Sequence, residues 1–196
     1  MQLNIILAGV GGQGILTIAS VINQAAIHKG LHIRQAEVHG MSQRGGAVQS
    51  HLRISARKIY SDLISRGTAH LILSVEPLEA LRYLPYLAPG GKVVTATDPV
   101  VNITGYPNLE AIFAELHRTD RPLLVSAAEH ARQAGNIRTS NMVMLGAAAP
   151  FTGMTPEELE SGIEKLFHKK GADTIDMNIR AFRKGLELSQ QQASDT

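Results

Sequence analysis

The sequence predicts an α/β fold, a single domain in which helices flank both faces of an open, mostly parallel sheet. Short apolar runs, typical of buried parallel strands, alternate with stretches of helical periodicity along the first two thirds of the chain. A glycine-rich turn joins the first apolar run to the first helical stretch, which is the arrangement at the start of Rossmann-like folds. At 196 residues the chain is long enough for one such domain.

Six segments have the composition of strands. Runs such as 3–8 and 70–75 are apolar almost throughout and are expected inside a parallel sheet. The segment 47–55 instead alternates apolar and polar residues, which predicts a half-buried strand at an edge of the sheet or facing a partner. The expected strands are 3–8, 32–38, 47–55, 70–75, 92–97 and 122–126.

Helices are expected between these strands and over the last third of the chain. Pro77 at a first helical position and the capping box that begins at Thr155 mark two helix starts. The segment 140–149 is apolar nearly all round, so its helix must be buried in this core or against another subunit. We expect residues 1–189 to form one domain and 190–196 a frayed polar tail. The expected helices are 15–28, 77–87, 109–117, 140–149, 156–169 and 174–188.

Charge and composition argue against several classes of function. The 19 basic and 17 acidic residues leave a net charge of +2, and no block of Lys or Arg indicates a nucleic-acid surface. No apolar run reaches the ~20 residues that span a bilayer, and the start lacks a basic signal region, so we expect a cytoplasmic protein without a membrane segment. There is no cysteine to hold an iron–sulfur cluster, and the eight histidines are scattered, so no metal site is expected on this chain.

The segment 9–14, here called the first glycine-rich loop, has the Gly-x-Gly-x-x-Gly spacing of dinucleotide-binding turns. Such glycines let an anion approach the N-terminus of the next helix, where free N–H groups favour negative charge. Glu37 lies roughly where a ribose-binding acid would follow. Alternatively, the glycines serve only close packing or the approach of another chain, and the Gln13 amide could bind a partner or a ligand. The candidate contacts are Gly11, Gly12, Gln13 and Gly14.

The segment 39–46, the second glycine-rich loop, is the more specific motif. Arg44 offers a planar fork of donors, and adjacent glycines leave backbone amides open to a carboxylate or phosphate. It could hold an anion jointly with the first glycine-rich loop at the carboxyl edge of the sheet, or bridge to an acid across a subunit interface. His51 could support it by hydrogen bonding, and Asn141 is expected first near a helix N-cap and second as a ligand contact. The candidates here are His39, Ser42, Gln43, Arg44, Gly45 and Gly46.

Seven motifs follow one another along the chain. They are Ala8-Gly9-Val10-Gly11-Gly12-Gln13-Gly14, His39-Gly40-Met41-Ser42-Gln43-Arg44-Gly45-Gly46, His51-Leu52-Arg53-Ile54-Ser55, Glu76-Pro77-Leu78-Glu79-Ala80-Leu81-Arg82, Pro89-Gly90-Gly91, Asn141-Met142-x-x-Leu145-Gly146-Ala147 and Asn178-x-x-Ala181-Phe182-x-x-Gly185. Together they resemble the gamma-type domain of 2-oxoacid:ferredoxin oxidoreductases over nearly the whole chain. The second glycine-rich loop is most similar to that of the beta subunit of indolepyruvate ferredoxin oxidoreductases.

The resemblance implies that the chain is a subunit and not a complete enzyme. Members of the family oxidatively decarboxylate a 2-oxoacid to an acyl-CoA and pass electrons to ferredoxin. The resemblance also implies that thiamine diphosphate, Mg²⁺ and iron–sulfur clusters belong to a larger partner subunit, with CoA as co-substrate and no cofactor on this chain. The two glycine-rich loops are then the expected contacts with that partner, its substrate or CoA.

Two other classes of function stay open on the residues alone. The first glycine-rich loop and Glu37 could serve a stand-alone NAD- or FAD-dependent oxidoreductase. The same amides could serve an anion- or nucleotide-binding regulatory protein without enzymatic activity. Arg44 favours the subunit hypothesis, because a simple dinucleotide-binding site does not need it.

Overall fold

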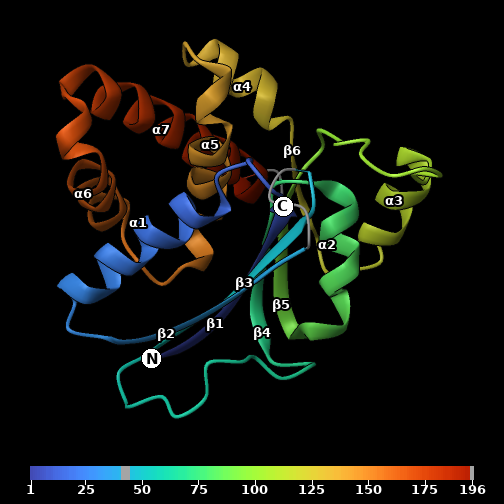
Figure 1. Cartoon of the computed structure of the whole chain (residues 1–196), viewed down its shortest axis with the longest axis horizontal. Coiled ribbons are helices and arrows are strands. Elements are labelled where there is room, and N and C mark those ends of the chain that lie inside the picture. Colours follow the sequence, from blue (N-terminus) through green and yellow to red (C-terminus); the bar gives the residue numbers. More distant parts are fainter. Residues whose placement is uncertain (41–44, 195–196) are drawn as a thin grey trace.

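The computed structural model describes residues 1–40 and 45–194, which form one α/β domain around a six-stranded sheet (Figure 1). The strands follow the order β2-β3-β1-β4-β5-β6 across the sheet. β1 pairs in parallel with β4, β4 with β5 and β5 with β6, whereas β3 is antiparallel to both β1 and β2. Only β3 therefore runs against the other described strands, which confirms a mostly parallel sheet. The strands are β1 (Gln2–Val10), β2 (His32–His39), β3 (Ala47–Ser55), β4 (Ala69–Ser74), β5 (Leu87–Ala96) and β6 (Leu123–Val125).

Helices cover both faces of this sheet, as predicted. In Figure 1 α1, α5, α6 and α7 lie on one side of the strands, and α2 and α3 lie on the other. Within the described part of the chain, no helix is long and apolar enough to cross a membrane. The helices are α1 (Ile15–His28), α2 (Pro77–Tyr83), α3 (Leu109–Leu116), α4 (Ala127–Gln133), α5 (Ser140–Ala148), α6 (Pro156–Phe167) and α7 (Ala172–Ser194).

β1 is buried on both faces and divides the core in two. Ile5 and Leu7 pack into the larger core with α1 and α5, while Ile6 and Ala8 pack into the smaller core with α2 and α3. Successive side chains of a strand point to opposite faces, so a strand covered on both sides has to be apolar at nearly every position. This explains the apolar run from which the strand was predicted.

Helices α5 and α7 cross at two glycines. A Cβ at Gly146 would lie 1.9 Å from the carbonyl oxygen of Phe182, and one at Gly185 would lie 1.9 Å from that of Val143. Only glycine allows two backbones to approach this closely. α5 is thereby enclosed between the sheet and α7, so the nearly all-apolar segment is a buried helix of this chain's own core, one of the two predicted alternatives.

The edge position predicted for the alternating strand is wrong. β3 lies inside the sheet between β1 and β2, and β2 is the edge strand. On the polar face of β3, His51 and Ser55 are buried, at 4% and 8% exposed, so this face is not open to solvent along its whole length. The loop 56–68 passes close to this polar face, and the backbone N–H of Ile64 donates to His51 Nδ1.

Several predicted boundaries also need correction. α2 ends at Tyr83 because Pro85 cannot continue an α-helix, and a short 3₁₀ turn over Leu84–Tyr86 leads directly into β5. α4 was not predicted, because its short alanine-rich sequence has little apolar periodicity. The capping box at Thr155 is confirmed. α7 continues past the predicted end at 188 to Ser194, and Gln192 Nε2 donates to the carbonyl of Pro122 at 3.4 Å.

Candidate functional site

The two glycine-rich loops meet at the carboxyl edge of the sheet. The first follows the end of β1, and the second joins β2 to β3 at the same edge, because β2 runs in the direction of β1. The backbone N–H of Gly11 donates to the carbonyl of Gly46 at 2.8 Å, and that of Gly45 donates to the carbonyl of Gly11 at 3.4 Å. The predicted meeting of the two loops is therefore observed, and backbone groups make it.

Asn141 of α5 packs against the first glycine-rich loop at Gly14. Gly14 has a φ of +81° and occupies the N-cap of α1, and a Cβ there would lie 2.5 Å from Asn141 Nδ2. This amide donates to the Gly14 carbonyl at 3.3 Å, and Asn141 is 8% exposed. Gly12 has a φ of +100°, a backbone conformation that favours glycine, and no atom lies within 4 Å of where its Cβ would be. Asn141 thus supports the loop, and Gly12 presents backbone to the outside.

Both the oxygen and the nitrogen of the Gln13 side-chain amide form hydrogen bonds within this chain. Its Oε1 accepts from the backbone N–H of Val10 at 2.7 Å, and its Nε2 donates to the carbonyl of Val75 at 3.0 Å. The side chain therefore ties the first glycine-rich loop to the end of β4. This differs from the prediction of an amide that is turned toward a partner or a ligand.

A cavity of about 320 Å³ lies beside the first glycine-rich loop. Its volume is at the small end of the range for small-molecule sites, roughly 300–1,000 Å³. Its wall consists of glycine backbone and apolar side chains at the start of α1. The lining residues are Val10, Gly11, Gly12, Gly14, Ile15, Leu16 and Val48.

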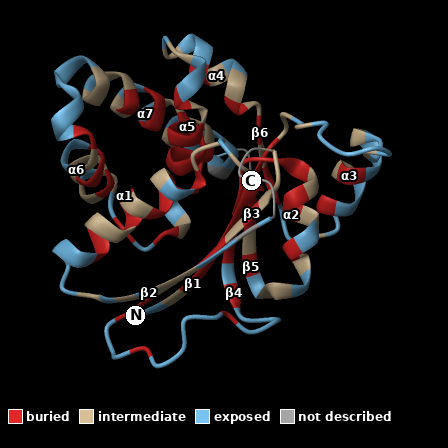
Figure 2. Cartoon of the chain, in the orientation of Figure 1, coloured by how far each residue is buried: buried red, intermediate tan, exposed pale blue. Residues whose placement is uncertain are grey.

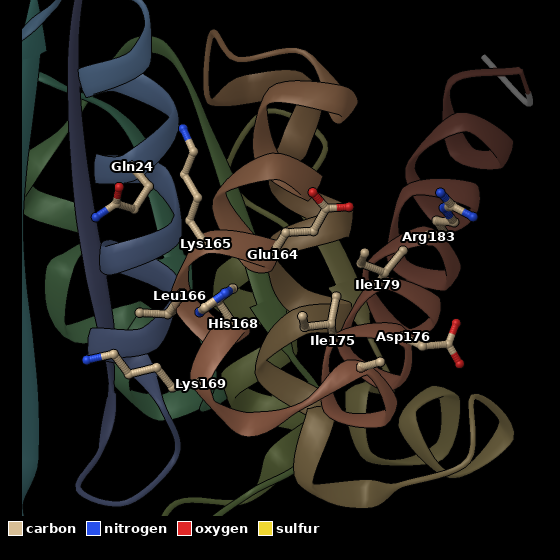
Figure 3. Close-up of a pocket in the computed structure, with 11 residues that line it drawn as sticks. Gln24, Glu164, Lys165, Leu166, His168, Lys169, Ile175, Asp176, Ile179 and Arg183 are labelled. Carbon is tan, nitrogen blue, oxygen red and sulfur yellow. The ribbon is translucent and has the colours of Figure 1, made fainter.

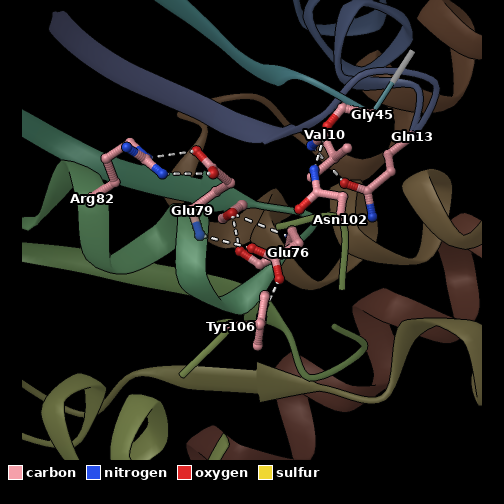
Figure 4. A network of polar contacts seen from close by, with 9 residues as sticks. Val10, Gln13, Gly45, Glu76, Glu79, Arg82, Asn102 and Tyr106 are labelled. Atoms are coloured by element: carbon pink, nitrogen blue, oxygen red, sulfur yellow. Dashed lines mark hydrogen bonds and ion pairs between the residues drawn. The ribbon is translucent and has the colours of Figure 1, made fainter. Parts of the chain in front are cut away.

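The segment 97–108, here called the covering loop, reaches over this edge after β5. Figure 4 shows Asn102 beside Gly45 and Tyr106 beside Glu76. Asn102 Nδ2 donates to the Gly45 carbonyl, and the Tyr106 hydroxyl donates to Glu76 Oε1. The backbone N–H of Val100 also donates to Glu76 Oε1, at 3.4 Å. The covering loop therefore joins the second glycine-rich loop to a buried carboxylate.

Glu76 was not predicted as a site residue, although it holds the centre of this network. It is 1% exposed, follows β4 and caps α2, where its Oε2 accepts from the backbone N–H of Glu79 at 2.8 Å. The sequence signal for this cap is the Glu-Pro pair at the helix start. Its link to Tyr106 depends on a contact between residues far apart in the chain, so no local pattern could reveal it.

Burial shifts two pKa values around Glu76. Burial and the hydrogen bond to Glu76 raise the pKa of Tyr106 well above its usual range, so the phenol stays protonated and can donate. Burial also raises the pKa of the Glu79 carboxyl, and the Arg82 guanidinium opposes this shift. Arg82 contacts both oxygens of Glu79, at 3.1 and 3.3 Å.

Large apolar side chains are exposed around the two loops. Val101 and Ile103 flank Asn102 on the covering loop and are 71% and 48% exposed. Val38, at the end of β2, is 50% exposed, and Leu16, in the first turn of α1, is 38% exposed. Apolar side chains gathered in this way commonly mark an interaction surface. We call the two glycine-rich loops and these four side chains the glycine edge.

The other predicted site residues separate into two groups. Ser42, Gln43 and Arg44 lie outside the described residues. His39 ends β2, where it is paired in register with Val48 of β3. His51 lies farther down β3, where its Nδ1 accepts from the backbone N–H of Ile64 at 2.9 Å, so it does not support the second glycine-rich loop in the predicted way.

The strand order argues against the dinucleotide hypothesis. Glu37 is on β2, and β3 lies between β2 and β1, so the acid is two strand spacings from β1, roughly 10 Å. A ribose-binding acid would instead be needed on a strand next to β1. The Gly11 N–H, which would face a pyrophosphate, is used by the Gly46 carbonyl.

A larger cavity, of about 800 Å³, lies away from the glycine edge, between α1, α6 and α7 (Figure 3). Leu166, Ile175 and Ile179 form its apolar part, with charged side chains of both signs around them. None of the predicted site residues that the structure describes lines it. Within the described ranges, no group of three or more His, Asp or Glu side chains could hold a metal ion.

Comparisons with known proteins agree on one family. Residues 4–188 match the family described as pyruvate ferredoxin/flavodoxin oxidoreductase. The chain is 40% identical to indolepyruvate oxidoreductase subunit IorB of Methanothermobacter thermautotrophicus, over 94% of this chain and 96% of that protein. It is 37% identical to the IorB subunit of Thermococcus kodakarensis, over 97% of both chains.

Solved structures share the fold. A 2-oxoglutarate:ferredoxin oxidoreductase from Magnetococcus marinus, with 2-oxoglutarate, coenzyme A and succinyl-CoA bound, matches with a TM-score of 0.75 and 22% identity. The match covers 97% of this chain but 31% of that longer polypeptide. The gamma subunit of a keto/oxoacid ferredoxin oxidoreductase from Geobacter sulfurreducens matches with a TM-score of 0.69 and 23% identity, over 96% of this chain and 99% of that subunit.

Proposed function

Because the chain belongs to the pyruvate ferredoxin/flavodoxin oxidoreductase family, we propose that it is the small subunit of an indolepyruvate-type 2-oxoacid:ferredoxin oxidoreductase. In this proposal the complex oxidatively decarboxylates an aryl pyruvate to an acyl-CoA and passes the electrons to ferredoxin. The similarity to two IorB subunits over almost their whole length supports the aryl substrate class.

The glycine edge is the observation that carries this proposal. Its loops are joined by backbone hydrogen bonds, and the side chains of Gln13, Asn141 and Asn102 hold them in place. Exposed apolar side chains surround it, and a free chain gains nothing from exposing them. We infer that the larger subunit covers this edge and that the joint surface completes the substrate or CoA site.

The donor atoms of the chain support placing the redox chemistry on the larger subunit. The chain has no cysteine for an iron–sulfur cluster, and its described residues include no cluster of three or more His, Asp or Glu side chains that could hold a metal ion. Thiamine diphosphate, when bound to the larger subunit, would supply the carbanion chemistry. This chain would then bind and orient the substrate or CoA, and exclude water, where it contacts the larger subunit.

Two groups of the glycine edge suit an anionic substrate. The backbone N–H groups at the start of α1 favour negative charge, and the Arg44 guanidinium would pair with a carboxylate or phosphate. A 2-oxoacid carboxylate and the phosphates of CoA have the required chemistry. Replacing Arg44 by Ala should then weaken binding of one of these groups by about 1.5–3 kcal/mol, the range for a charge-assisted hydrogen bond. Unchanged KM values for indolepyruvate and CoA in the assembled complex would contradict this role.

Co-expression with the larger subunit tests the proposal directly. The purified complex should reduce ferredoxin or a viologen dye when indolepyruvate and CoA are added, and the isolated chain should not. In the variant Val101→Asp/Ile103→Asp the complex should be weakened about tenfold or more, because charge is placed in the covered apolar surface. Ile27→Asp is the matched control, since Ile27 is 60% exposed on α1 outside the edge.

Two results would reject the proposal. One is a wild-type chain that does not associate with the larger subunit; the other is an isolated chain that turns over a 2-oxoacid unaided. Calorimetric titration with NADH, NADPH and FAD tests the rival dinucleotide hypothesis. We expect no binding at micromolar concentration, because the Gly11 N–H is occupied and Glu37 is displaced from β1.

A further inference from the structure

The loop 56–68 lies at the end of the sheet opposite to the glycine edge. It connects β3 to β4, runs beneath the strands in Figure 1 and contains no helix or strand. Connections of this length without secondary structure are uncommon in compact domains and often have a function of their own. We therefore expect the loop 56–68 to have a role besides joining β3 to β4.

A row of polar side chains on three neighbouring strands holds this loop in place. Asn4, Arg53 and Arg34 are paired in register across β1, β3 and β2. Asn4 Nδ2 donates to the carbonyl of Thr68 at 3.0 Å, and Arg34 Nε donates to that of Ile59 at 3.3 Å. Arg53 Nη1 donates to two carbonyls of the loop, at 2.8 and 3.2 Å. The backbone of the loop is thus ordered before any partner binds.

The loop divides its apolar residues between the core and the solvent. Ile59 and Ile64 are 8% and 3% exposed, whereas most of the loop is coloured as exposed in Figure 2. Tyr60 and Leu63 are 86% and 59% exposed. An aromatic and an aliphatic side chain held outward on an ordered backbone lose little conformational entropy on binding, which favours a docking role.

The charge of the loop indicates the chemistry of its partner. Arg57, Lys58 and Arg66 are exposed, and among the described residues none of them forms an ion pair with an acid. Asp62, the loop's one acidic residue, lies 3.5 Å from Arg34. A cavity of about 370 Å³ opens between loop and sheet beside Arg57 and Lys58. A carboxylate side chain from a partner would find opposite charge there.

We propose that the loop 56–68 is a second docking surface, which binds an acidic segment of the larger subunit. Tyr60 and Leu63 enter apolar pockets of that segment, and one of its carboxylates occupies the cavity beside Arg57 and Lys58. This proposal rests on the function proposed above. A second copy of the same chain fits less well, because its identical basic loop would be repelled.

Affinity measurements with the larger subunit immobilised test this surface. The variants Tyr60→Ala/Leu63→Ala and Arg57→Glu/Lys58→Glu should each raise the dissociation constant about tenfold or more. Ile27→Ala is the control for the apolar pair, and Lys169→Glu/Lys170→Glu for the basic pair, since these residues are also exposed. The controls should bind like the wild type. All four variants should keep the thermal midpoint of the wild type, because exposed side chains contribute little to stability.

Three outcomes would overturn the docking surface. If both loop variants bind the larger subunit as tightly as the wild type, the loop does not touch it, and the proposed function stands. If sedimentation shows a dimer of the isolated chain that the loop variants dissociate, the occupant is a second copy. If the wild-type chain forms no complex, the proposed function fails together with the docking surface.

Discussion

At the scale of single residues, buried polar groups order the loops that carry the proposed contacts. Glu76 holds the covering loop through Tyr106 and Val100, and His51 holds the loop 56–68 through the backbone of Ile64. A buried polar group destabilises the folded state unless its hydrogen-bond partners are present. Removing any of these contacts should therefore lower the free energy of unfolding measurably.

Tyr106→Phe isolates the contact with Glu76. The variant removes a hydrogen bond to a buried carboxylate, so we expect the free energy of unfolding to fall by about 1.5–3 kcal/mol. Urea unfolding of both proteins measures this change. The matched control is Tyr60→Phe, which removes a hydroxyl from a side chain that is 86% exposed and should change stability by less than about 0.5 kcal/mol. Equal stabilities of the two variants would contradict the role given to Glu76.

His51 should make the stability of the chain depend on pH. Burial lowers the pKa of His51 below its ordinary value of 6.5, and its Nδ1 must be unprotonated to accept from Ile64. Below pH 6.5 the unfolded chain therefore binds the proton more readily than the folded chain. The contribution of His51 is complete above pH 6.5 and is lost as the pH falls through its folded-state pKa, by at most about 1.4 kcal/mol per pH unit.

Urea unfolding of the wild type and of His51→Gln at several pH values between 7.5 and 5 measures this effect. Gln keeps an acceptor oxygen for the Ile64 N–H and does not titrate. The difference in stability between the two proteins should therefore change in favour of Gln as the pH falls. A difference that stays constant over this range would show that His51 does not titrate on unfolding.

At the scale of elements, the crossing of α5 and α7 depends on the close backbone approach at Gly146 and Gly185. Gly146→Ala and Gly185→Ala should each destabilise the protein by at least about 2 kcal/mol, because the new Cβ meets backbone, which can move only with its helix. The better helix propensity of Ala recovers only about 1 kcal/mol of this. Lys184→Ala, next to Gly185 on the outside of α7, is the control and should be nearly neutral. Thermal unfolding of the three variants distinguishes them.

Elements with strong local signals were predictable from the sequence. The apolar run of β1 and the capping box of α6 are local, so the start of each was found within a residue or two. α4 was missed, since its seven residues offer only Ala127 and Ala131 as a buried face. The edge position predicted for β3 was wrong because alternation indicates how the two faces of a strand are covered and not which strands lie beside it. Here the loop 56–68, which follows β3, contacts the polar face.

The candidate site was predictable only in its backbone. Glycines at fixed spacing after strands indicate tight turns, and the parallel direction of β1 and β2 brings both turns to one edge. The use of Gln13 within the chain and the role of Glu76 depend on contacts with Val75 and Tyr106, which only the folded structure brings together. The part played by Ser42, Gln43 and Arg44 stays a prediction.

At the scale of the whole molecule, the glycine edge and the loop 56–68 lie at opposite ends of one sheet, and both are proposed to contact the larger subunit. If both bind at once, Val101→Asp and Tyr60→Ala should act independently. The loss of binding free energy in the double variant should equal the sum of the single losses within about 0.5 kcal/mol, as for distant sites. A double variant no weaker than the worse single variant would mean that the two surfaces do not bind together.

The reversed direction of β3 has a geometric consequence for such a complex. This strand leaves the second glycine-rich loop and ends where the loop 56–68 begins, so a single extended stretch, Ala47–Ser55, sets the distance between the two contacts. At ~3.4 Å per residue that distance is about 30 Å. The larger subunit must therefore reach along the full height of the sheet, and inserting or deleting residues within this stretch would disturb the fit at both ends while leaving the chemistry of each contact unchanged.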